Sequence, residues 1–149
     1  MKKSVVIYTD GACSGNPGAG GWAAILKYKD KEKVLSGGEK STTNNRMEMT
    51  AVINGLKALK ESCRVTVYSD SAYTVNAFNE GWIDKWLING WKSGNKEVKN
   101  RELWEELIRE KSRHDVVFRK VEGHKDDELN NRCDKIAREE TKKISSSAD

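Results

Sequence analysis

The stretch Val5-Val6-Ile7-Tyr8-Thr9-Asp10-Gly11-Ala12 decides how this chain folds. Its β-branched and aromatic residues predict a buried strand. The strand closes on a carboxylate and a glycine, where the chain must turn. The same pattern returns sixty positions later as Val65-Thr66-Val67-Tyr68-Ser69-Asp70-Ser71-Ala72. Two such strands place two carboxylates side by side at one edge of a sheet, which is where ligands bind in open α/β sheets.

Length and composition predict one globular domain. The chain has 149 residues, and we expect a single domain over residues 1–144 with a disordered tail at 145–149. Charged residues make up 34% and hydrophobic residues 36%, which is typical of a strongly solvated surface. No stretch is long enough to span a bilayer, and no apolar signal region follows the basic N-terminus. These features predict a cytoplasmic protein that does not contact membranes.

The cysteines and the net charge restrict function only weakly. Cys13, Cys63 and Cys133 are far apart and have no metal-ligand spacing. An odd number of cysteines without a secretory signal favours reduced thiols, and we expect Cys63 and Cys133 to be packing residues. The net charge of +4 permits a polyanionic partner but does not require one.

Hydrophobic periodicity predicts an α/β fold. The glycine-dense stretch 13–21 predicts a tight connection whose backbone can approach another group closely, although composition alone favours a flexible hairpin loop. Strands at 22–28 and 34–41 would follow the first strand as an antiparallel meander. The remaining pattern predicts a helix at 44–60, a strand at 65–69, a short helix from Ser71, a helix at 101–111, a strand at 115–121 and a final helix at 128–143. This order indicates a mixed five-stranded sheet, three strands antiparallel and two parallel, with helices on both faces.

The segment 81–100 is rich in tryptophan. Trp82, Trp86 and Trp91 alternate with lysines and precede a polar loop expected at 93–100. Such a pattern suits stacking beside a phosphate-contacting face. The alternative is a small satellite core, which we expect some of these rings to form.

Four carboxylates need an explanation together. Asp10 and Asp70 end strands, whereas Glu48 and Asp134 lie along the buried stripes of helices. Each has an ordinary explanation alone; Asp70, for example, fits the N-cap of the next helix. Converging carboxylates repel one another unless they are protonated or bridged by a cation. An all-oxygen site suits Mg²⁺ or Mn²⁺, and two such ions clamp the attacking and leaving oxygens of a phosphodiester.

These residues carry a resemblance to a known family. The blocks Tyr8-Thr9-Asp10-Gly11, Ser14-Gly15-Asn16-Pro17-Gly18, Asn44-Asn45-Arg46-Met47-Glu48 and Tyr68-Ser69-Asp70-Ser71 resemble the signatures of type 1 ribonuclease H, and Gly123-His124 with residues 130–134 completes the set. The match runs in order from about residue 4 to residue 143. Segment 81–100 resembles the basic protrusion of many bacterial members.

The resemblance implies a ribonuclease H-like fold and an activity. The enzyme would be a monomeric endonuclease that hydrolyses the RNA strand of RNA–DNA hybrids, leaving 5′-phosphate and 3′-hydroxyl ends. Its two Mg²⁺ ions, with Mn²⁺ as a substitute, would be held by Asp10, Glu48, Asp70 and Asp134. Glu48 would also sense a 2′-hydroxyl, and His124 would assist proton transfer or product release. The hybrid would be recognised across its shallow minor groove.

The resemblance also implies substrate contacts. Thr43 and Asn100 match a pocket for a DNA phosphate. The other implied contacts lie near the carboxylates or in the protrusion: Cys13, Asn16, Asn44, Asn45, Ser71, Trp82, Lys85, Trp86, Lys92 and Lys99. The chain departs from the family pattern at Ala72, at Asn131 and in the acidic run 126–128.

Two other functions stay open at this point. Another nuclease of the same fold, such as a junction resolvase or an integrase core, would share the carboxylates but not the Asn44-Asn45-Arg46 block. A catalytically dead hybrid-binding module is disfavoured because all four acids are present. Cleavage of a labelled hybrid in a Mg²⁺ titration separates these possibilities.

Overall fold

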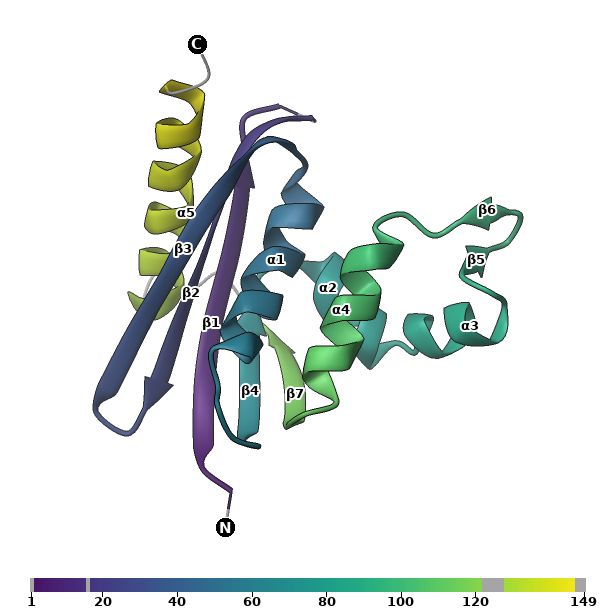
Figure 1. The fold of residues 1–149 in the computed structure, drawn as a ribbon, viewed down its shortest axis with the longest axis horizontal. Coiled ribbons are helices and arrows are strands. Elements are labelled where there is room, and N and C mark those ends of the chain that lie inside the picture. Colours follow the sequence, from purple (N-terminus) through teal and green to yellow (C-terminus); the bar gives the residue numbers. More distant parts are fainter. Residues whose placement is uncertain (1, 16, 122–127, 147–149) are drawn as a thin grey trace.

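A mixed sheet forms the centre of the molecule. The computed structural model describes residues 2–15, 17–121 and 128–146. Within these ranges the sheet has the strand order β3-β2-β1-β4-β7 (Figure 1). The strands β1, β2 and β3 pair antiparallel, and β4 and β7 run parallel to β1. The bounds of the five strands are β1 Ser4–Cys13, β2 Gly18–Tyr28, β3 Lys31–Thr42, β4 Arg64–Ser69 and β7 Asp115–Lys120. The predicted α/β fold with five strands, three antiparallel and two parallel, is confirmed.

Helices cover both faces of the sheet. On one face lie α1 (Asn44–Lys57), which packs on β1 and β2, and α2 (Ala72–Asn79), which packs on β4 and β7. Helix α4 (Arg101–Lys111) packs on α1. On the other face α5 (Glu128–Ser146) packs on β1, β2 and β3 (Figure 1).

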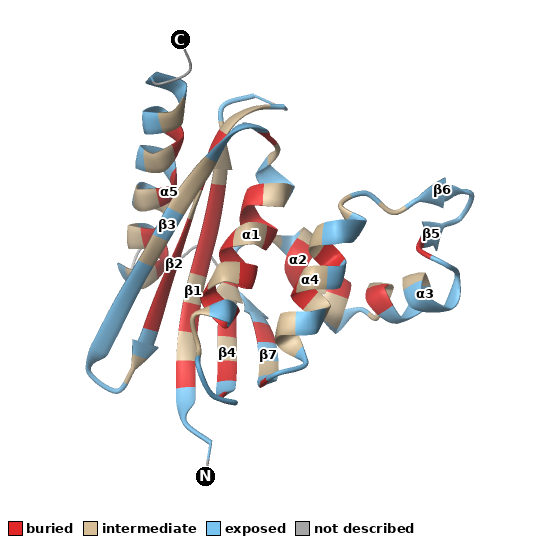
Figure 2. Ribbon diagram, in the orientation of Figure 1, coloured by how far each residue is buried: buried red, intermediate tan, exposed pale blue. Residues whose placement is uncertain are grey.

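The core lies mainly between the sheet and α1. Alternate residues of β1 and β4, such as Ile7 and Val67, are fully buried against Met49, Val52 and Leu56 of α1 (Figure 2). A smaller cluster under α5 consists of Ala23, Ile25, Cys133 and Ala137. Cys63 and Cys133 are both buried, as predicted for packing residues.

The glycine-dense stretch is partly strand, which corrects the predicted loop at 13–21. Residues from Gly18 onward belong to β2. A Cβ at Gly20 would lie 2.5 Å from Cγ2 of Thr42, and one at Gly21 would lie 2.4 Å from the backbone oxygen of Ala137. The glycines therefore let β3 and α5 approach the β2 backbone closely.

Two other boundaries differ from the prediction. The N-cap of α2 is Ser71, whose Oγ accepts a hydrogen bond from the Thr74 N–H at 3.2 Å, so Asp70 is not the cap. Helix α5 continues to Ser146 and so includes positions 145 and 146, which were expected in the tail; residues 147–149 lie outside the described ranges.

The tryptophan-rich segment projects from the body of the molecule (Figure 1). It contains α3 (Trp82–Ile88) and two short paired strands, β5 (Lys92–Ser93) and β6 (Lys96–Glu97), where a loop was expected. We call residues 81–100 the protrusion. No helix in the described part of the chain has both the length and the apolar character needed to cross a membrane.

Candidate active site

The parallel pairing of β1 and β4 brings two carboxylates together. The register aligns Thr9 with Ser69, so Asp10 and Asp70 are the next residues at the same edge of the sheet. Asp10 is still within β1 and is only 3% exposed, whereas Asp70 follows β4 and is exposed. The Asp10 Oδ1 accepts a hydrogen bond from the Gly11 N–H at 2.9 Å, which orients the carboxylate.

Gly11 allows helix α1 to add a third carboxylate. A Cβ at Gly11 would lie 2.5 Å from the Glu48 nitrogen and 2.6 Å from the Met47 carbonyl carbon. Because glycine has no Cβ, the first turns of α1 lie directly on the β1 backbone, and Glu48 is buried there at 2% exposure. One oxygen each of Asp10, Glu48 and Asp70 lie within 4.8 Å of one another.

The electrostatics of this cluster favour protonation when no cation is present. Burial, followed by the charge of Asp70, raises the pKa of Asp10 to about 7, although interactions with Glu48 and the Gly11 N–H act in the opposite direction. Burial and the neighbouring Asp10 raise the pKa of Glu48 well above its ordinary value. Two buried carboxylates in contact cannot both ionise without compensation.

The cluster fits a divalent cation on its own chemistry. Glu48 Oε2 is buried and has no hydrogen-bond partner among the described residues. The three side chains offer only carboxylate oxygens, which Mg²⁺ and Mn²⁺ prefer. A cation would neutralise the repulsion and supply the partner that Glu48 Oε2 lacks.

Asp134 lies beside this cluster and not within it. It is on α5, its charge contributes to the raised pKa of Asp10, and its Oδ2 pairs with Arg138 Nη2 at 2.9 Å. Asn131 lies on the exposed surface of the same helix. Two residues implied by the resemblance, Asn16 and His124, lie outside the described ranges, as do residues 126 and 127 of the acidic run.

The start of α1 meets the start of α4 through Arg46. Its backbone N–H donates to Thr43 Oγ1 at 3.2 Å, and its Nη1 donates to Asn100 Oδ1, also at 3.2 Å. The same nitrogen forms an ion pair with Glu102 at 2.6 Å. Thr43 and Asn100, predicted to share a phosphate pocket, are thus joined by an arginine. Arg46 belongs to the Asn44-Asn45-Arg46-Met47-Glu48 motif but was not among the predicted site residues.

Other predicted contact residues lie on or next to the elements that carry the cluster. Asn44 and Asn45 are exposed in the first turn of α1, and Ser71 is half-buried at the N-cap of α2. The Cys13 thiol, also half-buried, donates to the Thr42 carbonyl oxygen at 3.3 Å. Ala72 is exposed beside Ser71.

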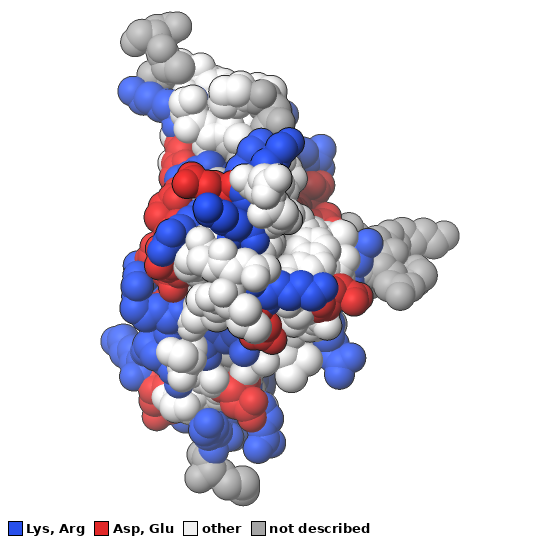
Figure 3. Space-filling view, turned by 90° about the vertical axis from the view of Figure 1, so that its right-hand side faces the viewer, with Lys and Arg blue, Asp and Glu red and all other residues white. Residues whose placement is uncertain are grey.

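The tryptophans of the protrusion pack against the core, and two of them also line a hollow on the surface. Trp91 is buried at 7% exposure, and Trp86 lies 5.4 Å from the buried Trp104 ring. These rings extend the main core and do not form the separate satellite core that was the alternative prediction. Trp82 and Trp86 also line a hollow of about 440 Å³ together with Lys85, Asn89, Lys92, Ser93 and Gly94. Lys99 is exposed outside this hollow. Figure 3 looks at this end of the molecule and shows basic, acidic and uncharged side chains intermingled.

The fold and the site define an α/β protein with a carboxylate cluster suited to divalent cations at the carboxyl edge of its sheet. Comparison with known proteins is more specific, because the RNase H family model matches residues 2–142. The chain belongs to the RNase H family. It is 62% identical over 144 residues to the ribonuclease H of Acetivibrio thermocellus, covering 96% of this chain and 98% of that protein. It is also 62% identical over 143 residues to the ribonuclease H of Caldicellulosiruptor saccharolyticus, covering 95% and 99%.

A solved structure supports the same assignment. LC9-RNase H1, described as a type 1 RNase H with the type 2 active-site motif, superposes with a TM-score of 0.87 at 26% identity. The match covers 97% of this chain and 74% of that one. Family membership therefore favours ribonuclease H over the resolvase and integrase alternatives.

Proposed function

We propose that this protein is an endonuclease that hydrolyses the RNA strand of RNA–DNA hybrids. The observation that carries the proposal is the Asp10–Glu48–Asp70 cluster in a chain of the RNase H family. Asp10, Glu48 and Asp70, together with Asp134, would hold two Mg²⁺ ions, with Mn²⁺ as a substitute. When bound, these ions would supply a polarised water and neutralise charge on the phosphodiester. The products would carry 5′-phosphate and 3′-hydroxyl ends.

The remaining residues would position the substrate. The cluster of Thr43, Arg46 and Asn100 offers a guanidinium, a hydroxyl and an amide to a DNA phosphate. A further set of residues lies within a few positions of the carboxylates in the sequence and would contact the minor groove of the hybrid: Cys13, Asn16, Asn44, Asn45 and Ser71. Lys85 and Lys92, with Trp82 and Trp86, would hold the hybrid at the protrusion, together with Lys99. His124 would assist proton transfer or product release.

The state of the protein is part of the same proposal. We propose a single catalytic domain over residues 1–144 that acts as a monomer in the cytoplasm. The high identity to two ribonucleases H over nearly their whole length supports the domain assignment. A sedimentation measurement of the free chain tests the monomer.

Cleavage of an end-labelled RNA–DNA hybrid in a Mg²⁺ titration tests the function. We expect cleavage of the RNA strand only, no cleavage of duplex DNA, and loss of activity in Asp10→Asn. The matched control is Asp30→Asn, the same chemical change at an exposed residue between β2 and β3, which should retain wild-type turnover. A wild-type protein that binds the hybrid without cutting it would instead be a binding module.

A further inference from the structure

Among the described residues, helix α5 covers only part of one face of the sheet. Helix α5 packs on β1, β2 and β3 of this face. Farther along the sheet, Tyr68 on β4 is half-buried, and Val117 and Arg119 on β7 are exposed. An uncovered sheet face that carries aromatic and basic side chains is a candidate interaction surface.

A hollow of about 380 Å³ lies on this face. Its lining combines two tyrosines, Tyr8 and Tyr68, with two exposed lysines, Lys27 and Lys29, and is completed by Ser4, Val6 and Leu129. This volume is within the range of about 300–1,000 Å³ usual for ligand sites. The hollow is separate from the one that Trp82 and Trp86 line at the protrusion.

Two stacked tyrosines, which we call the platform, have basic groups around them. The Tyr8 and Tyr68 rings stack with centroids 4.8 Å apart and planes 15° from parallel. The β4–β7 register places Arg119 beside Tyr68, on the side away from Tyr8. In the described part of the chain, neither Arg119 nor Lys27 has an acidic partner within 4.0 Å. Lys29 lies over the Tyr28 ring at 5.4 Å, a contact that a phosphate can share.

The platform is close to the carboxylate cluster. Tyr8 precedes Asp10 by two positions in β1, so both side chains are on the same face, roughly 7 Å apart along the strand. Tyr68 precedes Asp70 by two positions in the parallel strand. A nucleic acid strand that leaves the cluster thus reaches this face within a few nucleotides.

We propose that this hollow binds a single strand of RNA, with a base stacked on Tyr68 and phosphates held by Lys27, Lys29 and Arg119. Aromatic platforms beside basic side chains bind single strands in this way, with little sequence preference. The occupant is RNA because hydrolysis of the hybrid releases RNA strands beside this face. This step rests on the proposed function.

Photo-crosslinking locates the strand. An RNA oligomer of about eight nucleotides that carries 5-iodouridine is irradiated with the full chain, and the crosslinked peptide is identified by mass spectrometry. We expect crosslinks at Tyr68 or Tyr8. Crosslinks confined to the protrusion would overturn the proposal.

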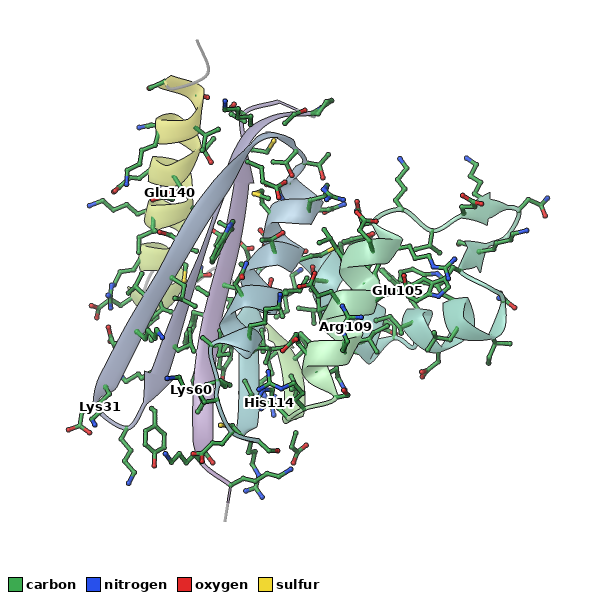
Figure 4. The ribbon with its side chains drawn as sticks, in the orientation of Figure 1. Lys31, Lys60, Glu105, Arg109, His114 and Glu140 are labelled. Carbon is green, nitrogen blue, oxygen red and sulfur yellow. The ribbon has the colours of Figure 1, made fainter. Side chains whose placement is uncertain are left out.

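Binding measurements test the basic groups. Lys27→Gln/Lys29→Gln should weaken binding of the RNA oligomer and reduce its slope against log salt by about 1.4, which corresponds to two lost phosphate contacts. The matched control is Lys31→Gln/Lys33→Gln, two exposed lysines on the neighbouring strand, where Lys31 marks the end of the β2–β3 hairpin (Figure 4). Equal effects of the two pairs would contradict a site at the hollow.

A third variant tests stacking, and hybrid cleavage separates the two proposals. Tyr68→Leu should lower affinity for the RNA oligomer about tenfold or more, while circular dichroism confirms its fold. Lys27→Gln/Lys29→Gln should cleave the blunt hybrid at the wild-type rate. Wild-type protein that cleaves the hybrid but gives no crosslink at the tyrosines refutes this inference alone, whereas wild-type protein that never cleaves the hybrid refutes the proposed function.

Discussion

At the scale of single residues, burial of the Asp10–Glu48 pair lowers the stability of the metal-free fold. Both side chains are at most 3% exposed, and burial raises the pKa of each. Unlike most buried polar groups, Glu48 Oε2 has no hydrogen-bond partner among the described residues. Natural proteins retain such unfavourable groups mainly at functional sites.

Asp10→Asn is therefore expected to stabilise the metal-free protein at pH 8. The change in pKa from 3.8 to about 7 corresponds to about 4 kcal/mol at most. Asparagine has nearly the same volume and keeps an oxygen that can accept from the Gly11 N–H, so thermal unfolding should show Tm raised by several degrees. Added Mg²⁺ should raise Tm of the wild type and not of this variant. An unchanged Tm in EDTA would show that neither burial nor repulsion makes the charged Asp10 carboxylate unfavourable in the folded protein.

At the scale of elements, the site depends on how closely α1 approaches β1. The hydrophobic stripe of α1 and the pattern of β1 were readable from the sequence, because each follows the period of its element. The close contact between α1 and β1 was not readable from the sequence, because it depends on the absence of a Cβ at Gly11. In the same way, a composition rich in glycine suggested a loop where Gly20 and Gly21 allow close packing within a strand.

Gly11→Ala tests this contact. The added Cβ would meet backbone atoms of Met47 and Glu48, which cannot rotate away, so α1 must shift. We expect a loss of roughly 2–3 kcal/mol in the free energy of unfolding and a large loss of turnover at temperatures where the variant is folded. Gly55→Ala is the control, because the nearest neighbours of its Cβ would be side-chain atoms, Ile7 Cγ2 at 3.0 Å and Ala24 Cβ at 3.6 Å. Similar turnover in the two variants would show that activity does not depend on the position of α1 against β1.

The protrusion allows a second test at this scale. Lys85 and Lys92 line the same hollow as Trp82 and Trp86. Lys85→Ala/Lys92→Ala should weaken hybrid binding and flatten its salt dependence, since fewer counterions are released. Turnover at saturating hybrid should change much less. Lys31→Ala/Lys33→Ala is the control with the same change in charge. An unaltered salt slope would show that the protrusion contributes to packing and not to hybrid binding.

At the scale of the whole molecule, the direction of the strands followed from the sequence because short links require antiparallel neighbours and helical crossovers give parallel ones. Asp10 and Asp70 meet for that reason, because the parallel pairing of β1 and β4 places them at the same edge of the sheet. Contacts between distant side chains were not predictable: Arg46 reaches Asn100, 54 positions away, and no local period encodes such a pairing. The stacking of Tyr8 on Tyr68 likewise depends on the register between two strands.

The pH dependence of global stability combines two opposite contributions. For Asp10, whose folded pKa is raised, stability is fully present below about pH 4 and is lost as pH rises through about 7. His114 behaves in the opposite way, because burial lowers its pKa. The charges of Arg113 and Lys2 lower this pKa further, whereas the Leu56 carbonyl and Glu110 raise it by less than the total lowering. Its stabilising effect is present above its ordinary value of 6.5 and is lost as pH falls through the folded pKa.

His114→Gln separates the two contributions. His114 lies at the end of the sheet where β7 begins (Figure 4), and its Nδ1 accepts the Cys63 N–H at 3.1 Å, a bond that protonation of Nδ1 would break. Urea unfolding of the metal-free wild type should show about 1 kcal/mol lost from this bond as pH falls below 6.5. His114→Gln should lose that acid-side decline and keep the decline from pH 4 to 7, which Asp10→Asn should lose instead. If His114→Gln retained the wild-type profile on the acid side, another group would be responsible for it.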